Sequence, residues 1–337
     1  MKKLVPTIIT GLITLSGVTE ASETLPPLAL DLSQTTVSGL SSGGYMATQF
    51  HLANSNWING AALIGTGPYY CAQGDIGIAL GQCVSKLNSP IDTTDLLAQA
   101  KEYAKAGLLP ALDNLADDRV WILHGTQDST VNRGAADALV AQYQHWVTNG
   151  TVTYIDDKPF AHHFPTEDQG SSCSVSESPY LGACGYDAAG ELLQALLGEL
   201  NPKATGLPEN LHRFDQHALG GEPADGLAES GYVYIPTACA AEDCRLHISF
   251  HGCNQNMQAV GDTYASSTGL NAWAETNRIV VLYPQTKTSM IMPLNPQGCW
   301  DWWGYSGNNY ANSEAAQVVA ITNMIEQLNS RSQQSGN

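Results

Sequence analysis

Basic residues are scarce in this chain. Lysine and arginine number 14 against 32 aspartate and glutamate residues, which gives a formal net charge of −18 over 337 residues. Nucleic acids and anionic membranes are bound through positive charge, so this composition argues against both as partners. A neutral substrate is compatible with such a surface.

Long apolar runs are missing after the first residues, since no later segment approaches about 18 consecutive apolar residues. Residues 1–21 read as a signal peptide: two lysines precede an apolar stretch that ends at Val18, and Ala21 with Ser22 offers a cleavage point. An uncleaved anchor is the alternative, although the stretch is short for a membrane span. We expect a secreted protein, extracellular or periplasmic, whose mature chain is 22–337.

Metal-binding cysteine patterns are also absent. There is no C-x-x-C pair and no cysteine at zinc-ligand spacing from two histidines, so we expect no metal. Eight cysteines in an exported chain are typical of disulfides. Short spacing favours three local pairs and leaves a fourth, although many other pairings are possible. The four disulfides expected on this basis are Cys71–Cys83, Cys173–Cys184, Cys239–Cys244 and Cys253–Cys299.

Strand-like apolar segments alternate with helical patterns, which is typical of an α/β fold with a mostly parallel sheet. Strands are expected at 35–39, 60–64, 120–124, 151–155, 231–236, 246–251 and 279–283, and helices at 43–54, 93–106, 134–148, 188–197 and 313–328. The stretch 201–226 is polar, rich in proline and glycine, and reads as a linker. A two-domain interpretation would divide the chain there.

One pentapeptide carries a catalytic signature. Gly39-Leu40-Ser41-Ser42-Gly43 matches G-x-S-x-G between an expected strand and an expected helix, the context in which this motif presents a nucleophilic serine. The start of the helix would direct the Ser42 N–H at a developing oxyanion. The alternative is a glycine-rich turn with an incidental serine.

A serine nucleophile needs a histidine base and a carboxylate that orients it. Asp128 follows the strand at 120–124 and a glycine turn, which makes it the favoured acid, with Asp156 and Asp157 as alternatives at the end of the next strand. The adjacent His162 and His163 come after that strand. Only one of them can be the base, and the spacing alone does not choose between them.

The second half of the chain contains a motif that ordinarily precedes the nucleophile. His251-Gly252-Cys253 ends an expected strand, Tyr283-Pro284 ends the next, and the aromatic run Cys299–Trp303 follows. Together with the serine turn and the H-x-F-P-T segment at His162, these motifs resemble the polyhydroxybutyrate depolymerase family of esterases. Most of that family carries the HGC motif first and the serine turn later, so this chain resembles a circular permutant of the kind found in single-domain fungal members.

The resemblance covers nearly the whole mature chain and assigns roles to matching residues. It implies a single permuted α/β-hydrolase domain over 22–337, with 201–226 joining the former termini. It favours His162 as the base, beside Ser41 as nucleophile and Asp128 as acid, and adds the Cys253 N–H to that of Ser42 in an oxyanion hole.

The same resemblance implies a polyester or oligoester substrate. Trp302, Trp303 and Tyr305 are the aromatic residues that we expect to line a substrate crevice. No cofactor is expected, and the protein is expected to act as a monomer. Esterases for other substrates, such as hydroxyalkanoate oligomers only, feruloyl esters or synthetic polyesters, are the alternative, and a secreted binding protein with a dead site is a further one.

Overall fold

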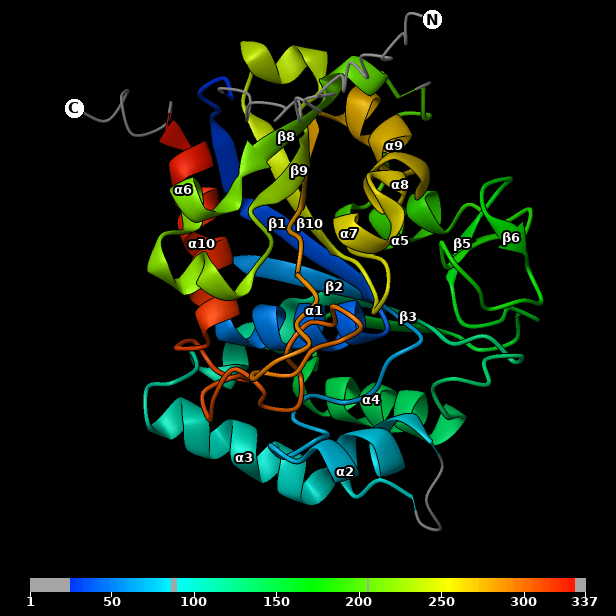
Figure 1. Ribbon diagram of the computed structural model, residues 1–337, viewed down its shortest axis with the longest axis vertical. Coiled ribbons are helices and arrows are strands. Elements are labelled where there is room, and N and C mark those ends of the chain that lie inside the picture. The colour runs from blue at the N-terminus through cyan, green and yellow to red at the C-terminus, as the bar shows by residue number, and fades with distance from the viewer. Residues whose placement is uncertain (1–24, 86–89, 205, 331–337) are drawn as a thin grey trace, which may run out of the picture.

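The computed structural model describes residues 25–85, 90–204 and 206–330 (Figure 1). The signal peptide expected over 1–21 lies outside these residues. The strands are β1 (Leu30–Leu40), β2 (Ile58–Ile64), β3 (Arg119–Leu123), β4 (Thr151–Ile155), β5 (Phe164–Thr166), β6 (Ser171–Ser172), β7 (Leu181–Ala183), β8 (Leu211–Asp215), β9 (Ser230–Tyr234), β10 (Cys244–Phe250) and β11 (Ile279–Tyr283). The α-helices are α1 (Ser42–Ala53), α2 (Ile76–Ile78), α3 (Thr93–Lys105), α4 (Arg133–Trp146), α5 (Ala188–Leu197), α6 (Gln216–Gly220), α7 (Met257–Val260), α8 (Thr263–Ser267), α9 (Leu270–Asn277) and α10 (Ala316–Leu328).

The central sheet joins the two halves of the chain. Its eight strands lie in the order β4-β3-β2-β1-β10-β11-β9-β8, so the first half supplies one side and the second half the other. All neighbours from β4 to β11 are parallel, whereas β9 pairs antiparallel with both β11 and β8. The α/β class with a mostly parallel sheet is therefore confirmed. The strand order reverses at β1 and β10, which is where ligands bind in open α/β sheets.

Strand side chains alternate between two cores because successive residues of a strand point to opposite faces. In β3, Val120 and Ile122 enter one core, while Trp121 and Leu123 enter the other. The first core is completed by residues of α1, α3, α4 and α10, and the second by residues of α5, α8 and α9. The sheet is thus buried between two helical layers, as its apolar parallel strands require.

The beginning and the end of the described chain lie side by side. The Leu28 N–H donates to the Leu328 carbonyl at 3.2 Å, and the Leu30 N–H donates to the Asn329 side-chain oxygen at 2.8 Å. The C-terminal end of α10 therefore lies beside the start of β1, the strand that leads to Ser41. This is the proximity that a permuted chain order requires.

The elements expected from periodicity agree with the structure within a few residues, but the segment 201–226 differs. It contains β8 and α6, which its periodicity did not predict. In β8 only Phe214 is buried, so this edge strand carries little apolar alternation. The small three-stranded sheet β5-β7-β6 was not predicted either, because its strands are only two or three residues long.

All eight cysteines form disulfides in the pairs expected from their spacing. The Cα–Cα distances are 6.0 Å for Cys71–Cys83, 4.8 Å for Cys173–Cys184, 5.8 Å for Cys239–Cys244 and 4.3 Å for Cys253–Cys299. Within the described ranges, no helix has the length and apolar character needed to cross a membrane.

Candidate active site

Ser41 occupies a strained turn between β1 and α1. Its φ of 57° and ψ of −120° are unfavourable for a residue with a side chain, and such strain is concentrated at functional sites. The flanking glycines are required by close contacts: a Cβ on Gly39 would lie 2.1 Å from the Gly43 carbonyl oxygen, and a Cβ on Gly43 would lie 2.2 Å from the Phe250 carbonyl oxygen. Only glycine therefore fits two residues before and two residues after Ser41, which accounts for the G-x-S-x-G motif.

His162 and Asp128 form a buried hydrogen-bonded pair. Asp128 Oδ2 lies 2.7 Å from His162 Nδ1, and the exposed fractions of these side chains are 1% and 6%. The other oxygen, Oδ1, accepts from the Thr130 and Val131 N–H groups at 2.9 Å each. An ionised carboxylate can only accept, so the Nδ1 atom of His162 carries the proton and Nε2 remains free to act as a base.

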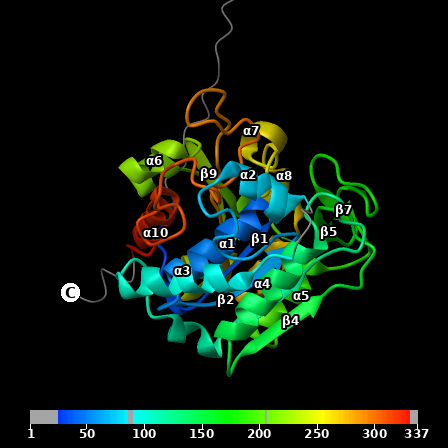
Figure 2. The same cartoon turned by 90° about the horizontal axis from the view of Figure 1, so that it is seen from below.

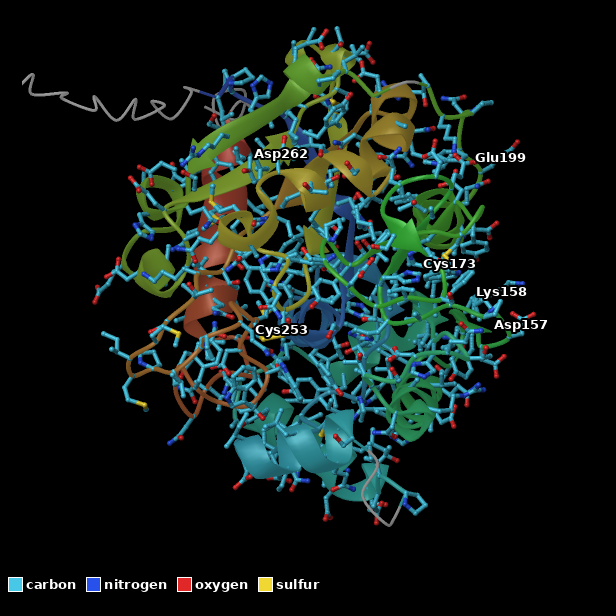
Figure 3. The ribbon with its side chains drawn as sticks, turned by 45° about the vertical axis from the view of Figure 1, so that its right-hand side comes forward. Asp157, Lys158, Cys173, Glu199, Cys253 and Asp262 are labelled. Carbon is cyan, nitrogen blue, oxygen red and sulfur yellow. A yellow bond between two sulfur atoms is a disulfide. The ribbon has the colours of Figure 1, made fainter. Side chains whose placement is uncertain are left out.

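The other candidates from the sequence do not join this pair. Asp156 is hydrogen-bonded to Arg133, and Asp157 is 71% exposed and pairs with Lys158. Figure 3 shows Asp157 at the outer surface, whereas Cys253 lies well inside the outline of the molecule. His163 donates through Nε2 to the Cys173 carbonyl at 2.8 Å, and burial lowers the pKa of its imidazole. His163 is therefore a structural histidine.

The Asp128 carboxyl is held in its ionised form. Burial alone would raise its pKa, but the hydrogen bond and charge of His162 and the Val131 N–H outweigh burial, so the pKa lies below its usual value. Gly65 at the end of β2 allows this close packing, because a Cβ there would lie 3.1 Å from Asp128 Oδ2 and 3.0 Å from His162 Nδ1. The residue also has a φ of +52°, which favours glycine.

This lowered pKa gives a prediction for the variant Asp128→Asn. The stabilisation by the carboxylate is fully present above the pKa of the unfolded chain, about 3.9, and is lost as the pH falls through the lower folded value. The difference in melting temperature between wild type and variant should therefore be constant above about pH 5 and shrink below about pH 4. Thermal unfolding followed by circular dichroism measures this difference, and one that persists to the lowest pH would contradict the lowered pKa.

The HGC segment after β10 lies directly against Ser41. A Cβ on Gly252 would be 3.5 Å from the Ser41 Cβ, and the Gly252 N–H donates to Gln255 Oε1 at 2.7 Å. His251 is fully buried and neutral: its Nδ1 donates to the Gly252 carbonyl at 2.7 Å, and its Nε2 accepts from the Thr286 N–H at 3.2 Å. Burial lowers the pKa of His251 to about 4.

His251 thereby orients a peptide bond. Because its hydrogen bond holds the Gly252 carbonyl, the Cys253 N–H of the same trans peptide must point the opposite way. The sequence motif identified the Cys253 N–H but not this positioning role of His251. This role follows from the two hydrogen-bond partners of the His251 ring, the Gly252 carbonyl and the Thr286 N–H, and the sequence does not show that the Thr286 N–H lies beside the ring.

A cavity of about 880 Å³ opens onto these groups. Ser41, Ser42, His162, Gly252 and Cys253 line one part of it, and the Cys253–Cys299 disulfide borders it. The lining also includes an aromatic wall, which we define as Trp302, Trp303 and Tyr305. Every residue expected from the sequence to serve in catalysis, in the oxyanion hole or in substrate binding therefore lines the cavity, except Asp128, which is hydrogen-bonded to His162.

The aromatic wall is held by ring contacts. Trp302 stacks on Tyr45 of α1 with ring centroids 4.1 Å apart and an interplanar angle of 7°. Trp303 packs edge-on against Trp302 at 5.6 Å and contacts the Tyr305 ring at 5.0 Å. The sequence did not single out Tyr45, although its place four residues after Ser41, on the helix that follows, puts it about one helical turn from Ser41.

In the described ranges, one group of side chains has the proximity of metal ligands. His163, Cys173 and Cys184 offer ligand atoms within 4.8 Å of one another. The two sulfur atoms form a disulfide, whereas a cysteine binds a metal ion through its free thiolate. This group therefore does not have the chemistry of a metal site.

Comparison with known proteins shows which proteins this chain resembles in sequence and in structure. The family model described as "Esterase PHB depolymerase" matches residues 230–332. The chain is 40% identical over 93% of its length to a poly(3-hydroxybutyrate) depolymerase of Delftia acidovorans, of which it spans 63%, and 34% identical over 95% of its length to a polyhydroxybutyrate depolymerase of Talaromyces funiculosus, of which it spans 96%. The crystal structure of a PHB depolymerase from Penicillium funiculosum superposes with a TM-score of 0.84 at 32% identity, covering 91% of this chain and 99% of that one. A PHB depolymerase complexed with an R3HB trimer gives the same values.

Proposed function

This chain belongs to the polyhydroxybutyrate depolymerase family, and we propose that it is a serine esterase that hydrolyses poly(3-hydroxybutyrate), or related polyhydroxyalkanoates, and their oligomers. The observation that carries the proposal is the 2.7 Å hydrogen bond between Asp128 and His162 at the cavity that Ser41 also lines. The chain spans about 63% of the length of the Delftia relative, so the activity of that whole protein is a proposal here.

The proposed reaction is acyl transfer in two steps. Ser41 Oγ attacks the ester carbonyl while His162 Nε2 accepts its proton, and the Ser42 and Cys253 N–H groups stabilise the oxyanion. The protonated His162 then delivers the proton to the leaving alcohol, which leaves an acyl-enzyme. Water activated by His162 attacks the acyl-enzyme and releases the hydroxy acid, and Asp128 stabilises the imidazolium in both steps.

The lining of the cavity supports a neutral substrate. Among the described residues that line it, none is an aspartate, glutamate, lysine or arginine. A charged substrate would find no side chain of opposite formal charge there, whereas an aliphatic polyester can pack against the aromatic wall. Feruloyl esters are also neutral, so the lining alone does not separate these two substrate classes.

A feature at the mouth of the cavity supports contact with solid polymer. Residues 290–294, which we call the apolar loop, carry four side chains that are more than half exposed: Met290 (76%), Ile291 (78%), Met292 (84%) and Leu294 (51%). Figure 2 shows the chain after β11 projecting beyond the rest of the molecule beside α7. Met292 and Leu294 line the cavity, so a surface bound by this loop would lie next to Ser41.

The proposal is tested with three substrates. The purified protein should clear an amorphous poly(3-hydroxybutyrate) suspension and cleave the soluble R-3-hydroxybutyrate trimer, with little turnover of feruloyl esters. The double variant Met290→Ser/Ile291→Ser should clear the suspension about tenfold more slowly, because it loses apolar contact area, and should keep its turnover of the trimer. Cleavage of feruloyl esters alone would contradict the depolymerase function, and cleavage of the trimer alone would restrict the substrate to oligomers.

We also propose that residues 1–21 are a signal peptide, and that 22–337 forms a single, circularly permuted domain in which 201–226 joins the former termini. The full pairing of the cysteines supports an exported protein, because disulfides persist in oxidising compartments. The hydrogen bond from Leu28 to Leu328 supports the permutation. A single chain supplies all the proposed site residues, which supports action as a monomer.

A further inference from the structure

Asp301 is a buried carboxylate that the reaction does not use. It lies between Trp300 and Trp302, and only 2% of it is exposed. Its Oδ1 accepts from the N–H groups of residues 303, 304 and 305 at 3.2, 2.7 and 3.0 Å. Its Oδ2 accepts from the N–H and the hydroxyl of Ser306 at 2.7 and 2.6 Å. Five donors from four consecutive residues thus converge on one side chain.

This carboxylate is held by neutral donors. Within the part of the chain that the structure describes, no lysine, arginine or histidine forms an ion pair with Asp301, and burial raises the pKa of its carboxyl. A buried anion is unfavourable unless hydrogen bonds replace its lost hydration, which these five donors do. The arrangement fixes the backbone of 303–306, because each N–H must keep pointing at the same group.

The fixed segment is the one that carries the aromatic wall. Trp302, Trp303 and Tyr305 all line the cavity, while the Asp301 carboxylate is buried away from it. Tyr305 is held further by its hydroxyl, which donates to the Cys299 carbonyl at 2.9 Å. The backbone conformation set by Asp301 therefore decides where these rings stand in the cavity.

Asp301 also ties the wall to the helix of the nucleophile. Its carbonyl accepts from Gln49 Nε2 of α1 at 2.9 Å, and its N–H donates to Gln317 Oε1 of α10 at 3.0 Å. Helix α1 begins at Ser42, directly after the nucleophile. The buried contacts from α1 through Gln49 to Asp301 therefore act together with the stack of Trp302 on Tyr45 to set the distance between Ser41 and the wall.

We propose that Asp301 is a positioning residue that sets the aromatic wall relative to Ser41 and so controls the binding of oligomeric esters, without touching the substrate. The inference rests on the proposed function, because it assigns the wall to substrate binding. A small acetyl ester needs only the nucleophile, the base and the oxyanion hole. An oligomer extends past these groups and must be held by the wall.

The variant Asp301→Asn tests this role at nearly constant shape. Its amide replaces one oxygen by a donor, so either the Ser306 groups or the N–H groups of 303–305 lose their acceptor. We expect KM for the R-3-hydroxybutyrate trimer to rise about tenfold, with kcat and KM for p-nitrophenyl acetate within about twofold of wild type. A change in tryptophan fluorescence should accompany the loss.

Two further variants control for a general loss of structure. Asp215→Asn makes the same substitution at a helix N-cap remote from the cavity, where the carboxylate accepts from the Ala218 N–H at 2.9 Å, and it should leave both substrates unaffected. Ser306→Ala removes only the hydroxyl donor and should raise KM for the trimer by about twofold to threefold. This milder change keeps the proposal testable if Asp301→Asn does not fold.

The outcomes separate the two proposals. Equal losses on the trimer and on p-nitrophenyl acetate, or no loss on either, in both Asp301→Asn and Ser306→Ala would overturn the positioning role. If the wild type does not cleave the trimer, the proposed substrate is wrong. The positioning role is then tested with p-nitrophenyl hexanoate against p-nitrophenyl acetate, and an unchanged ratio of kcat/KM in both variants would overturn it.

Discussion

Replacing Ser41 with alanine is expected to lower kcat for a soluble 3-hydroxybutyrate ester by about five to six orders of magnitude. The alanine has no hydroxyl to form the acyl-enzyme, while the oxyanion hole and the aromatic wall remain in place. The residual rate should therefore come from substrate binding and oxyanion stabilisation alone. Because the change removes one small atom, melting temperature should change little.

Active-site labelling measures the same step directly. A fluorophosphonate should modify the folded wild type once, at Ser41, and should not modify Ser41→Ala. Ser266→Ala is a matched control, since Ser266 lies on the exposed side of α8, and this variant should keep full labelling and turnover. Unmodified Ser41 in the folded wild type would contradict the proposed nucleophile.

The two adjacent histidines should give opposite results when each is replaced by glutamine. His162→Gln removes the base and should lower kcat by about four to six orders of magnitude. His163→Gln keeps an N–H donor for the Cys173 carbonyl and should retain most of the activity, with a loss of stability of about 1 kcal/mol. Steady-state kinetics and thermal unfolding of both variants check the pair.

A reversed result would reassign the base. If His163→Gln lost activity by orders of magnitude while its fold stayed intact, the orientation of the Asp128–His162 pair would not be the catalytic one. A loss of activity in both variants together with a large drop in melting temperature in His163→Gln would instead indicate that His163 supports the loop that carries His162. Near-ultraviolet circular dichroism distinguishes a distorted loop from a lost proton acceptor.

The inner strands of the central sheet were predictable because they are apolar and mostly buried. Segments such as β3 and β11 read clearly as strands, and the glycine spacing around Ser41 is dictated by contacts of about 2 Å that exclude any side chain. The position of Asp128 after β3 followed from the same logic, since parallel strands bring their carboxyl ends together. The choice of His162 over His163 needed the family resemblance, because spacing does not reveal which way a ring points.

Other features depended on contacts between distant parts of the chain. Nothing local in the sequence marks Asp301 as a buried anion with five donors, because aspartate is usually exposed. The antiparallel edge strand β8 was hidden by its weak alternation. The apolar loop can be recognised in the sequence, but its exposure beside the cavity, which supports a role in polymer binding, is known only from the structure.

The pairing of β1 with β10 has a consequence for the timing of assembly. Thr36 and His247 form a buried hydrogen bond at 2.8 Å across 211 residues of sequence, and the β1–β10 pair forms the middle of the sheet. Such distant pairings make folding slow, because the entropy of closing a long loop must be overcome before the contact forms. During synthesis, the segment with Ser41 is made long before β10 and Cys253. We therefore expect ester cleavage to begin only after β10 and Cys253 have been made, so shorter chains carry Ser41 without the second N–H group of the proposed oxyanion hole.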